Sequence, residues 1–349
     1  MNINNLSKKD LTEIIENNSN KLSEEIAKAA LNEKKKHYDN RIFARGLIEF
    51  TNICKNNCLY CGIRGENTGV KRYRLSKEQI LSCCKTGREL GFSTFVLQGG
   101  EDLYYTDKIM CDIIYSIKSQ YPNCAVTLSV GEKTKETYKE YKKAGADRYL
   151  LRHETANKDH YEKLHPKEMS FENRKRCLYE LKELGFQTGA GFMVGSPYQT
   201  YENLAEDLLF LKELKPHMVG IGPFLSHHET PFKNFENGSY ELTLTMLALT
   251  RLMIPDVLLP ATTALATLRP NFGRTDAFNV GANIVMPNLT LPEYRGDYLL
   301  YDNKLSSGNE AAQSVKNIEK EIIKSGNILD MSRGDSERIK DERKQIYEH

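Results

Sequence analysis

Residues 43–62 read FARGLIEFTNICKNNCLYCG, an apolar stretch that runs into a loop with three cysteines. Cys54, Cys58 and Cys61 place three thiols within eight residues. Cubane iron–sulfur clusters are usually held by four cysteines, and structural zinc is held by four ligands. Three thiolates therefore predict a cluster with one iron left open, where a small molecule can bind and receive an electron. A zinc site completed by a distant residue is the alternative, although the sequence lacks the second C-x2-C pair that such sites usually have.

The sequence after residue 41 alternates apolar segments with amphipathic ones. The apolar segments predict eight strands, over Phe43–Thr51, Thr94–Gln98, Ala125–Val130, Tyr149–Arg152, Gln187–Val194, Met218–Gly222, Leu258–Thr262 and Ala282–Met286. The amphipathic segments predict helices, for example over Lys77–Leu90, Lys108–Gln120, Thr134–Ala144, Phe171–Leu184, Tyr201–Leu214 and Leu242–Ile254. Strands separated by helices indicate parallel pairing, because each parallel connection needs a crossover. Eight units favour an α/β fold of the closed (β/α)8 TIM type, whereas three to six would suit a doubly wound sheet.

Further helices are predicted on either side of the barrel. Two polar helices, over residues 7–17 and 20–37, precede it. We expect an N-terminal helical segment over residues 1–40, the barrel over 41–302 and a C-terminal helical tail over 303–349. In the tail, Asn309–Ser325 carries one apolar stripe and is predicted to be a surface helix. The charge-rich sequence after Ser332 is predicted to be solvated or frayed.

Composition limits the classes of function. The chain has 349 residues and a net charge of +2, with no basic block of the kind that binds nucleic acid. No stretch approaches the ~18 apolar residues of a membrane span, and the polar N-terminus has no apolar signal core. We expect a soluble, cytoplasmic protein. The remaining five cysteines have no disulfide-framework spacing and are predicted to be small buried hydrophobes: Cys83, Cys84, Cys111, Cys124 and Cys177.

Small and charged residues follow the predicted strands, at the end where barrels carry active sites. After the second strand, Gly99 and Gly100 allow the backbone to approach a ligand, and Glu101 adds a carboxylate. Arg152 and Glu154 follow the fourth strand, where their spacing points them to the same side of the pleat. Arginine pairs with carboxylates in a fork geometry, so these residues, together with Arg174, suit a ligand such as S-adenosylmethionine (SAM). A plain loop and a surface ion pair are the alternatives.

Other polar residues allow two interpretations equally. Threonine hydroxyls inside a barrel can hold a polar or anionic substrate, but threonine also simply favours strands; the threonines concerned are Thr127, Thr262 and Thr263. Arg148 and His153 are equally ambiguous. Four histidines show no ligand spacing with the cysteines and are predicted to lie in loops or at the surface: His165, His217, His227 and His228.

The C-x3-C-x2-C pattern, with Tyr60 before its last cysteine, resembles the radical SAM superfamily. Further motifs resemble the HydE family of FeFe-hydrogenase maturases over residues 41 to 301. These motifs are GLIEFTNICKNNCLYCGIR, KRYRLSKEQI, VLQGGED, AVTLSVGE, AGADRYLLRHETAN, SFENR, TGAGFMVGSPYQT, MVGIGPF, PATTALAT and IVMPN. In that family a 4Fe–4S cluster, held by three cysteines, cleaves SAM to methionine and a 5′-deoxyadenosyl radical.

The resemblance implies roles for individual residues. Cys54, Cys58 and Cys61 would be the cluster ligands. The residues that would contact SAM are Tyr60, Gly100, Glu101, Ser129, Arg152, Glu154, Arg174 and Tyr298. The residues that would line the substrate cavity are Gln98, Thr127, Arg148, Thr262 and Thr263.

The resemblance also implies a pathway and partners. The substrate would be a cysteine-bound iron carbonyl cyanide from a companion maturase, modified during assembly of the di-iron subcluster of the hydrogenase H-cluster. Other maturases and an electron donor such as ferredoxin or flavodoxin would be partners of this anaerobic chemistry, with no nucleic acid and no membrane.

Some relatives carry three more cysteines near the C-terminus for an auxiliary cluster. Here the last cysteine is Cys177, so we predict no auxiliary cluster. Related radical enzymes, methylornithine synthase and biotin synthase, remain alternatives, as does an RNA-modifying radical enzyme, which the lack of a basic patch disfavours. A non-catalytic iron–sulfur or zinc module is the alternative from a different class.

Overall fold

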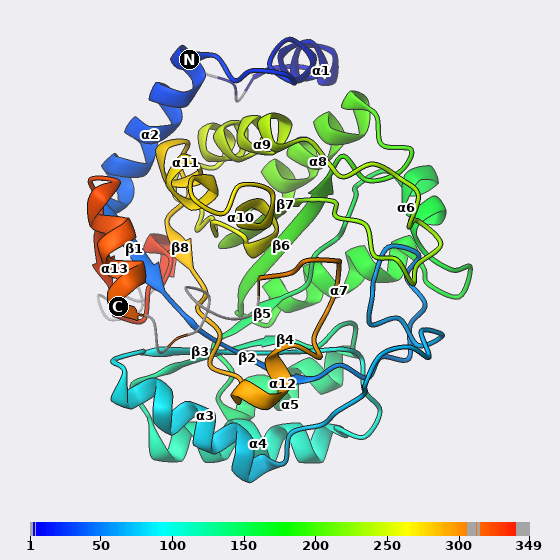
Figure 1. Cartoon of the computed structure of the whole chain (residues 1–349), viewed down its shortest axis with the longest axis vertical. Coiled ribbons are helices and arrows are strands. Elements are labelled where there is room, and N and C mark those ends of the chain that lie inside the picture. Colours follow the sequence, from blue (N-terminus) through cyan, green and yellow to red (C-terminus); the bar gives the residue numbers. More distant parts are fainter. Residues whose placement is uncertain (1–2, 4, 306–311, 313–314, 340–349) are drawn as a thin grey trace.

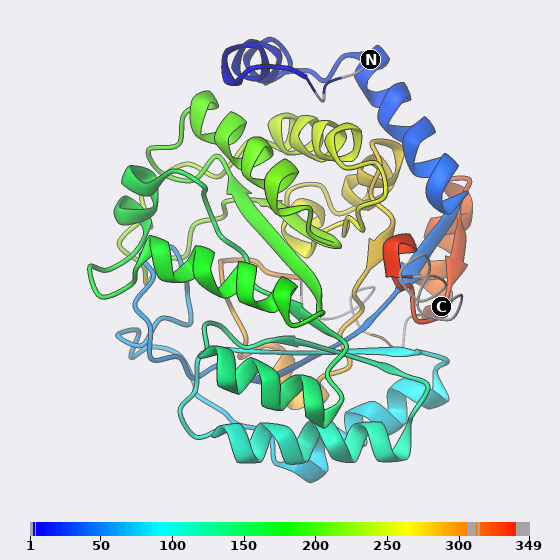
Figure 2. The same cartoon turned by 180° about the vertical axis from the view of Figure 1, so that it is seen from behind.

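The computed structural model describes residues 3, 5–305, 312 and 315–339, and it shows a ring of strands surrounded by helices (Figures 1 and 2). The strands are β1 (Arg41–Ala44), β2 (Gly46–Thr51), β3 (Thr94–Gly99), β4 (Ala125–Ser129), β5 (Arg148–Leu150), β6 (Gln187–Val194), β7 (Met218–Pro223), β8 (Ile284–Val285) and β9 (Ile328–Asp330). The helices are α1 (Lys8–Asn17), α2 (Glu24–Tyr38), α3 (Lys77–Glu89), α4 (Asp107–Gln120), α5 (Lys135–Ala144), α6 (Lys158–Leu164), α7 (Phe171–Glu183), α8 (Tyr201–Leu214), α9 (Tyr240–Met253), α10 (Thr263–Leu268), α11 (Gly273–Asn279), α12 (Pro292–Arg295) and α13 (Val315–Lys324).

Parallel pairing links the strands into a closed barrel. Strands β2 to β7 pair in chain order, and β8 pairs with β1. Between β7 and β8 the ring continues through parallel bridges made by Leu258 and Pro260. Leu47 in β2 bridges Asn288, just beyond β8, and this completes the circle. The predicted (β/α)8 TIM-type barrel is therefore confirmed.

The last two barrel strands are shorter than predicted. The segment Leu258–Thr262 forms only isolated bridges, and Ala282–Met286 shrinks to the two residues of β8. Pro260 and Pro287 lack the N–H group that a continuous ladder needs at those positions. The barrel is therefore joined by fewer hydrogen bonds on this side than between β2 and β7.

The N-terminal helices pack on the outer layer of the barrel. α1 packs on α8, and α2 packs on α9. α9 is consequently buried all round, and Glu241 is its only partly exposed residue. Ser7 and Ser23 cap α1 and α2 by accepting N–H groups of the first turn. Both predicted N-terminal helices are confirmed, although the second begins at Glu24 rather than at residue 20.

The charge-rich C-terminal sequence is not solvated as predicted. Up to residue 339 it crosses the N-terminal ends of the barrel strands and forms a floor. Asp335 pairs with Arg148 at 2.6 Å, and the carbonyl of Gly334 accepts a hydrogen bond from Arg45 at 3.1 Å. The charges of this segment find buried partners that lie far away in the sequence, which composition cannot reveal. Residues 340–349 lie outside the described residues.

The predicted surface helix Asn309–Ser325 is seen in part. α13 spans Val315–Lys324, with Ile318 and Ile322 buried along one stripe. Residues 309–311, 313 and 314 lie outside the described residues. Within the described part of the chain, none of the helices is long and apolar enough to cross a membrane.

The scattered cysteines are mostly buried, as predicted. Cys83, Cys84, Cys124 and Cys177 are buried, and Cys111 is half-buried; all carry free thiols. Burial raises the pKa of these thiols, so they behave as small apolar side chains rather than as nucleophiles.

Candidate active site

The loop that follows β2 carries the three clustered cysteines to the mouth of the barrel. Hydrogen bonds from its backbone fix it to three other segments: Lys55 N–H donates to the carbonyl of Glu101, Leu59 N–H to that of Leu164, and Gly62 N–H to that of Leu300. The N–H of Glu101 also points at Sγ of Cys54, at 3.4 Å. The cysteines therefore lie on a loop that is held from several sides and not free in solvent.

The three cysteines are half-buried, and their thiols are shielded enough from water for their pKa values to rise. Burial raises the pKa of the Cys58 thiol to about 12, although the charge of Arg174 opposes this rise. Burial also raises the pKa of Cys54 and Cys61, and the neighbouring cysteines raise that of Cys61 further. Three buried thiols are costly to ionise together, and a bound metal cluster would supply the compensating charge because a coordinated thiol is deprotonated outright.

The three cysteine sulfurs are not grouped as closely as the ligands of a single ion. Ligands of one ion lie close together; in the described part of the chain, the group whose ligand atoms all lie within 4.8 Å of one another is His227, His228 and Asp302. The three cysteines do not meet this condition. A tetrahedral zinc site would need sulfurs about 3.8 Å apart, so the zinc alternative is disfavoured.

The side chains of His227, His228 and Asp302 are held together by hydrogen bonds. Nδ1 of His227 accepts the N–H of Glu229 at 3.1 Å, so the proton of the neutral ring is on Nε2, the atom that faces Asp302. Asp302 accepts from Nδ1 of His228 at 2.7 Å, and its N–H donates to the carbonyl of Ser226. These contacts fasten the segment around Asp302 to the loop after β7.

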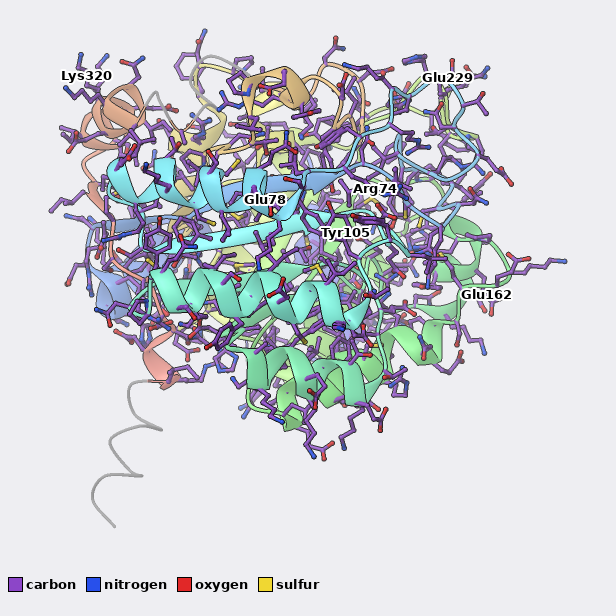
Figure 3. All side chains as sticks on the ribbon, turned by 90° about the horizontal axis from the view of Figure 1, so that it is seen from below. Arg74, Glu78, Tyr105, Glu162, Glu229 and Lys320 are labelled. Atoms are coloured by element: carbon purple, nitrogen blue, oxygen red, sulfur yellow. The ribbon has the colours of Figure 1, made fainter. Side chains whose placement is uncertain are left out.

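The Gly-Gly-Glu turn after β3 packs directly on the cysteine loop. A Cβ on Gly100 would lie 2.3 Å from the carbonyl oxygen of Ile53 and 2.8 Å from Cβ of Cys54. Only glycine therefore allows this approach. Asp102, which follows Glu101, forms a bidentate ion pair with Arg74. In Figure 3, Arg74 lies close to Tyr105, whose hydroxyl donates to the carbonyl of Leu75 at 2.6 Å.

Arg152 and Glu154 point to the same side, as predicted, and form an ion pair of 3.3 Å. Their buried Nε, Nη2 and Oε2 atoms have no hydrogen-bond partner among the described residues. Glu154 has a φ of +67°, a left-handed conformation that glutamate rarely adopts. Buried groups of both charges whose hydrogen bonds are incomplete suit a zwitterionic ligand that would complete them.

Arg174 reaches the same place from α7. It is buried, donates to the carbonyl oxygen of Arg152 at 2.7 Å, and forms an ion pair with Glu132. Tyr60 is held nearby, because its hydroxyl lies 3.2 Å from Nε2 of His165. Nδ1 of His165 bonds the carbonyl of Tyr161, so Nε2 is the acceptor and Tyr60 the donor.

One cavity of ≈ 290 Å³ unites most of the predicted site. Among the predicted residues it is lined by Cys54, Cys58, Tyr60, Cys61, Gln98, Gly100, Glu101, Ser129, Arg152, Glu154, Arg174, Thr262 and Tyr298. An adjoining cavity of ≈ 160 Å³ shares Gln98, Arg152 and Thr262 with it and adds Thr263. The predicted residues therefore lie around two connected spaces at the mouth and in the interior of the barrel.

Two predicted substrate residues lie elsewhere. Thr127 and Arg148 line a small separate space near the floor, together with Arg45 and His217. Arg148 begins β5, so it lies at the end of the strand opposite to the mouth. It bonds Asp335, Thr94 and Gln187 rather than facing the cysteines.

Some residues that line the cavities, and the burial of several histidines, could not be predicted from the sequence. Leu300 and Tyr301 line both cavities, but no local pattern marks a loop that folds back over a barrel. His165, His217 and His227 lie in loops, as predicted, but they are buried there, and of the four only His228 is exposed. Each of the three buried rings has a hydrogen-bond partner, which offsets the cost of burial.

Comparison with known proteins identifies the family. Residues 48–211 match the Radical SAM superfamily. The chain is 48% identical over 295 residues to the [FeFe] hydrogenase maturase subunit HydE of Thermotoga maritima, and the match covers 84% of each chain. The chain belongs to the radical SAM superfamily. It is also 29% identical to the 3-methylornithine synthase of Methanosarcina acetivorans, over 89% of this chain and 87% of that one.

Solved structures agree with this radical SAM assignment. The crystal structure of methylornithine synthase (PylB) has a TM-score of 0.81 at 26% identity and covers 93% of this chain and 94% of its own. The maturase HydG from Carboxydothermus hydrogenoformans has a TM-score of 0.80 at 24% identity, over 93% of this chain and 76% of that one, and this likeness concerns the fold alone. The protein is a radical SAM enzyme, a family that implies a 4Fe–4S cluster and SAM.

Proposed function

We propose that this radical SAM enzyme is an [FeFe] hydrogenase maturase. It modifies a cysteine-bound iron carbonyl cyanide precursor during assembly of the di-iron subcluster of the H-cluster. The 48% identity to HydE over 84% of both chains carries the proposal. The two cavities support it, because they join a mouth lined by the three cysteines to an interior space whose mainly apolar wall carries several polar side chains.

Cys54, Cys58 and Cys61 would hold the 4Fe–4S cluster and leave one iron open for SAM. When bound and reduced, the cluster supplies the electron that splits the sulfonium of SAM into methionine and a 5′-deoxyadenosyl radical. The other five cysteines do not line the cavity. We therefore propose a single cluster, without an auxiliary one.

The residues around the mouth would orient SAM. Gly100 brings backbone groups within reach, and the atoms of Arg152 and Glu154 that lack hydrogen bonds would bond the carboxylate and ammonium groups of SAM. Arg174 fixes Arg152 through its carbonyl oxygen. The remaining contacts would come from Tyr60, Glu101, Ser129 and Tyr298, which line the same cavity.

The interior cavity would hold the precursor. Gln98, Thr262 and Thr263 present polar groups there, which suits a polar complex. Lys304 and Arg274 also line it, but they are paired with Glu49 and Glu321. For Thr127 and Arg148 the substrate role remains a prediction, since they line the separate space near the floor. The partners we propose are the companion maturases and a low-potential donor such as ferredoxin or flavodoxin, in the cytoplasm.

The decisive experiment is maturation of a hydrogenase with purified components. We expect anaerobically reconstituted protein to bind about four irons per chain and to form 5′-deoxyadenosine with dithionite and SAM. With the companion maturases it should activate an apo-hydrogenase, and Cys58→Ala should abolish both activities. Release of no 5′-deoxyadenosine by the wild-type protein would instead support a non-catalytic iron–sulfur module.

Methylornithine synthase is the second candidate, because the overall fold likeness and the 29% identity both point to it. Incubation with lysine, SAM and reductant separates the two functions. Formation of methylornithine without hydrogenase activation would replace the maturase proposal.

A further inference from the structure

Between Arg152 and Glu154, His153 points the opposite way, out of the barrel. The strand itself ends at Leu150, but the contacts of His153 with Phe210 and Asp207 of α8 place its ring on the outer face. Its ring is 1% exposed and lies between the sheet and α8. It packs edge-on against Phe210 at 4.9 Å and tilted against Phe192 at 5.9 Å. The histidine therefore cannot contact a ligand in the cavity.

The ring of His153 is nevertheless fully bonded. Nδ1 accepts the N–H of Gly191 at 3.3 Å, so Nε2 carries the proton and donates to Oδ1 of Asp207 at 3.2 Å. The same Oδ1 accepts the N–H of Ala156 at 2.6 Å. One carboxylate oxygen on α8 thus holds the chain on both sides of Glu154.

Glu154 is the strained residue inside this span. Its φ of +67° costs free energy that the surrounding structure must compensate. In this conformation the carboxylate faces Arg152 and the cavity. The backbone of Glu154 also bonds both sides of Phe192: its N–H donates to Gly191 and its carbonyl accepts from Met193.

Asp207 is an unusual residue for the middle of a packed helix. It is fully buried, and its Oδ2 atom has no partner among the described residues. Burial raises the pKa of Asp207 and lowers the pKa of His153, so both groups are disfavoured in their charged forms. A buried carboxyl that leaves one oxygen unpaired is destabilising, and the bonds to His153 and Ala156 offset part of that cost.

We propose that Asp207 and His153 are positioning residues that hold Glu154 and Arg152 in the geometry that binds SAM. The proposal rests on the SAM-binding role proposed for Arg152 and Glu154. Asp207 and His153 do not contact the ligand themselves. They fix the backbone on both sides of Glu154, and Glu154 contacts the ligand.

The test compares three variants by cluster content and by affinity for SAM. Asp207→Leu removes both hydrogen bonds, and we expect at least a tenfold weaker Kd for SAM, read from the perturbation of the reduced-cluster EPR signal. Asp207→Asn keeps an acceptor oxygen and should restore binding to within about threefold of wild type. His153→Phe keeps the ring packing but loses both hydrogen bonds of the ring. We expect it to weaken binding more than threefold, but less than Asp207→Leu, because Asp207 still accepts the N–H of Ala156.

A matched control separates positioning from general loosening of α8. Leu208 is fully buried on the same helix, and Leu208→Ala should lower the melting temperature without weakening SAM binding. Iron content should stay at the wild-type level in all four variants, because the cysteine loop does not contact the pair.

Two results would overturn the proposal. One is wild-type affinity for SAM in His153→Phe, which also decides the matter should Asp207→Leu fail to fold. The other is a loss of SAM affinity in Leu208→Ala as large as that in the pair variants. Failure of the proposed function itself looks different, because wild-type protein would then bind no SAM at its cluster.

Discussion

The thioether sulfur of Met169 lies 3.7 Å from Sγ of Cys58. Met169 comes from the loop between α6 and α7 and lines an open groove beside the cysteine loop. It therefore lies between that groove and Cys58, which we propose as a cluster ligand. A cluster's reduction potential depends on its exposure to solvent and on contacts to its sulfurs, so in the proposed function this contact would influence the potential of the cluster.

We predict that Met169→Ala raises the midpoint potential of the cluster. Water would enter beside Cys58 and stabilise the reduced state, which carries one more negative charge. An EPR-monitored redox titration without SAM measures the shift. The midpoint potential of Met169→Leu should lie between those of wild type and Met169→Ala, because leucine keeps most of the side-chain volume. A midpoint equal to that of wild type in Met169→Ala would contradict the shielding role.

Gly100 gives a second prediction. An added Cβ would lie 2.3 Å from the carbonyl oxygen of Ile53, a backbone atom that cannot move without displacing Cys54. We expect Gly100→Ala to cost about 1–3 kcal/mol and to lower the iron content after reconstitution. Gly296 provides the control, since a Cβ added there would meet nothing within 4 Å and Gly296→Ala should match wild type in both respects. Full iron content in Gly100→Ala would refute this account of the turn.

Local patterns were sufficient to predict much of the site. The cysteine spacing, the glycine pair and the charges after the fourth strand lie close in sequence to the strands that carry them, and a barrel brings all strand ends to one mouth. The structure confirms that Arg152 and Glu154 lie together. The lengths of the two strands at Pro260 and Pro287 were overestimated, because the apolar composition of these segments predicts strands while the two prolines lack N–H donors.

Contacts between distant segments could not be predicted. Asp207 lies 54 residues from His153, and Asp335 lies 187 residues from Arg148, so no local periodicity links either pair. Arg148 was assigned to the substrate cavity, yet its position at the start of β5 places it at the floor. Its partner there comes from a tail that composition alone marks as solvated.

The hydrogen bond between His228 and Asp302 predicts that stability depends on pH. The hydrogen bond with Asp302, and then its charge, raise the pKa of His228 above its ordinary value of 6.5. The contribution of this contact to stability is therefore fully present below pH 6.5 and is lost as pH rises through the folded-state pKa. We expect Asp302→Asn to return the His228 pKa to about 6.5, as measured by NMR titration of the ring. Glu229→Gln should change the pKa of His228 less, since Glu229 lies 3.8 Å from the ring. An unaltered pKa of His228 in Asp302→Asn would contradict the hydrogen bond between His228 and Asp302.

Asp335, on the barrel floor, predicts a larger effect of pH on stability. Burial alone would raise the pKa of Asp335, but the charge of Arg148 and hydrogen bonds from Arg333 and Gln187 hold it well below its ordinary value. Its contribution to stability is thus present above the unfolded pKa of 3.8 and is lost as pH falls from there through the folded-state pKa. Because Arg148 is 3% exposed, Asp335→Asn leaves a buried charge without its counter-ion, which costs about 3 kcal/mol.

Denaturant unfolding at neutral pH and below the unfolded pKa of 3.8 measures this contribution. Asp335→Asn should lose about 3 kcal/mol at neutral pH, and the difference from wild type should shrink on acidification, as the carboxyl of the unfolded wild-type chain takes up its proton. Asp112→Asn removes the acid of a solvent-exposed pair with Lys77 and should cost at most about 1 kcal/mol. Equal losses in the two variants would mean that the C-terminal segment does not seal the floor through Asp335 and Arg148.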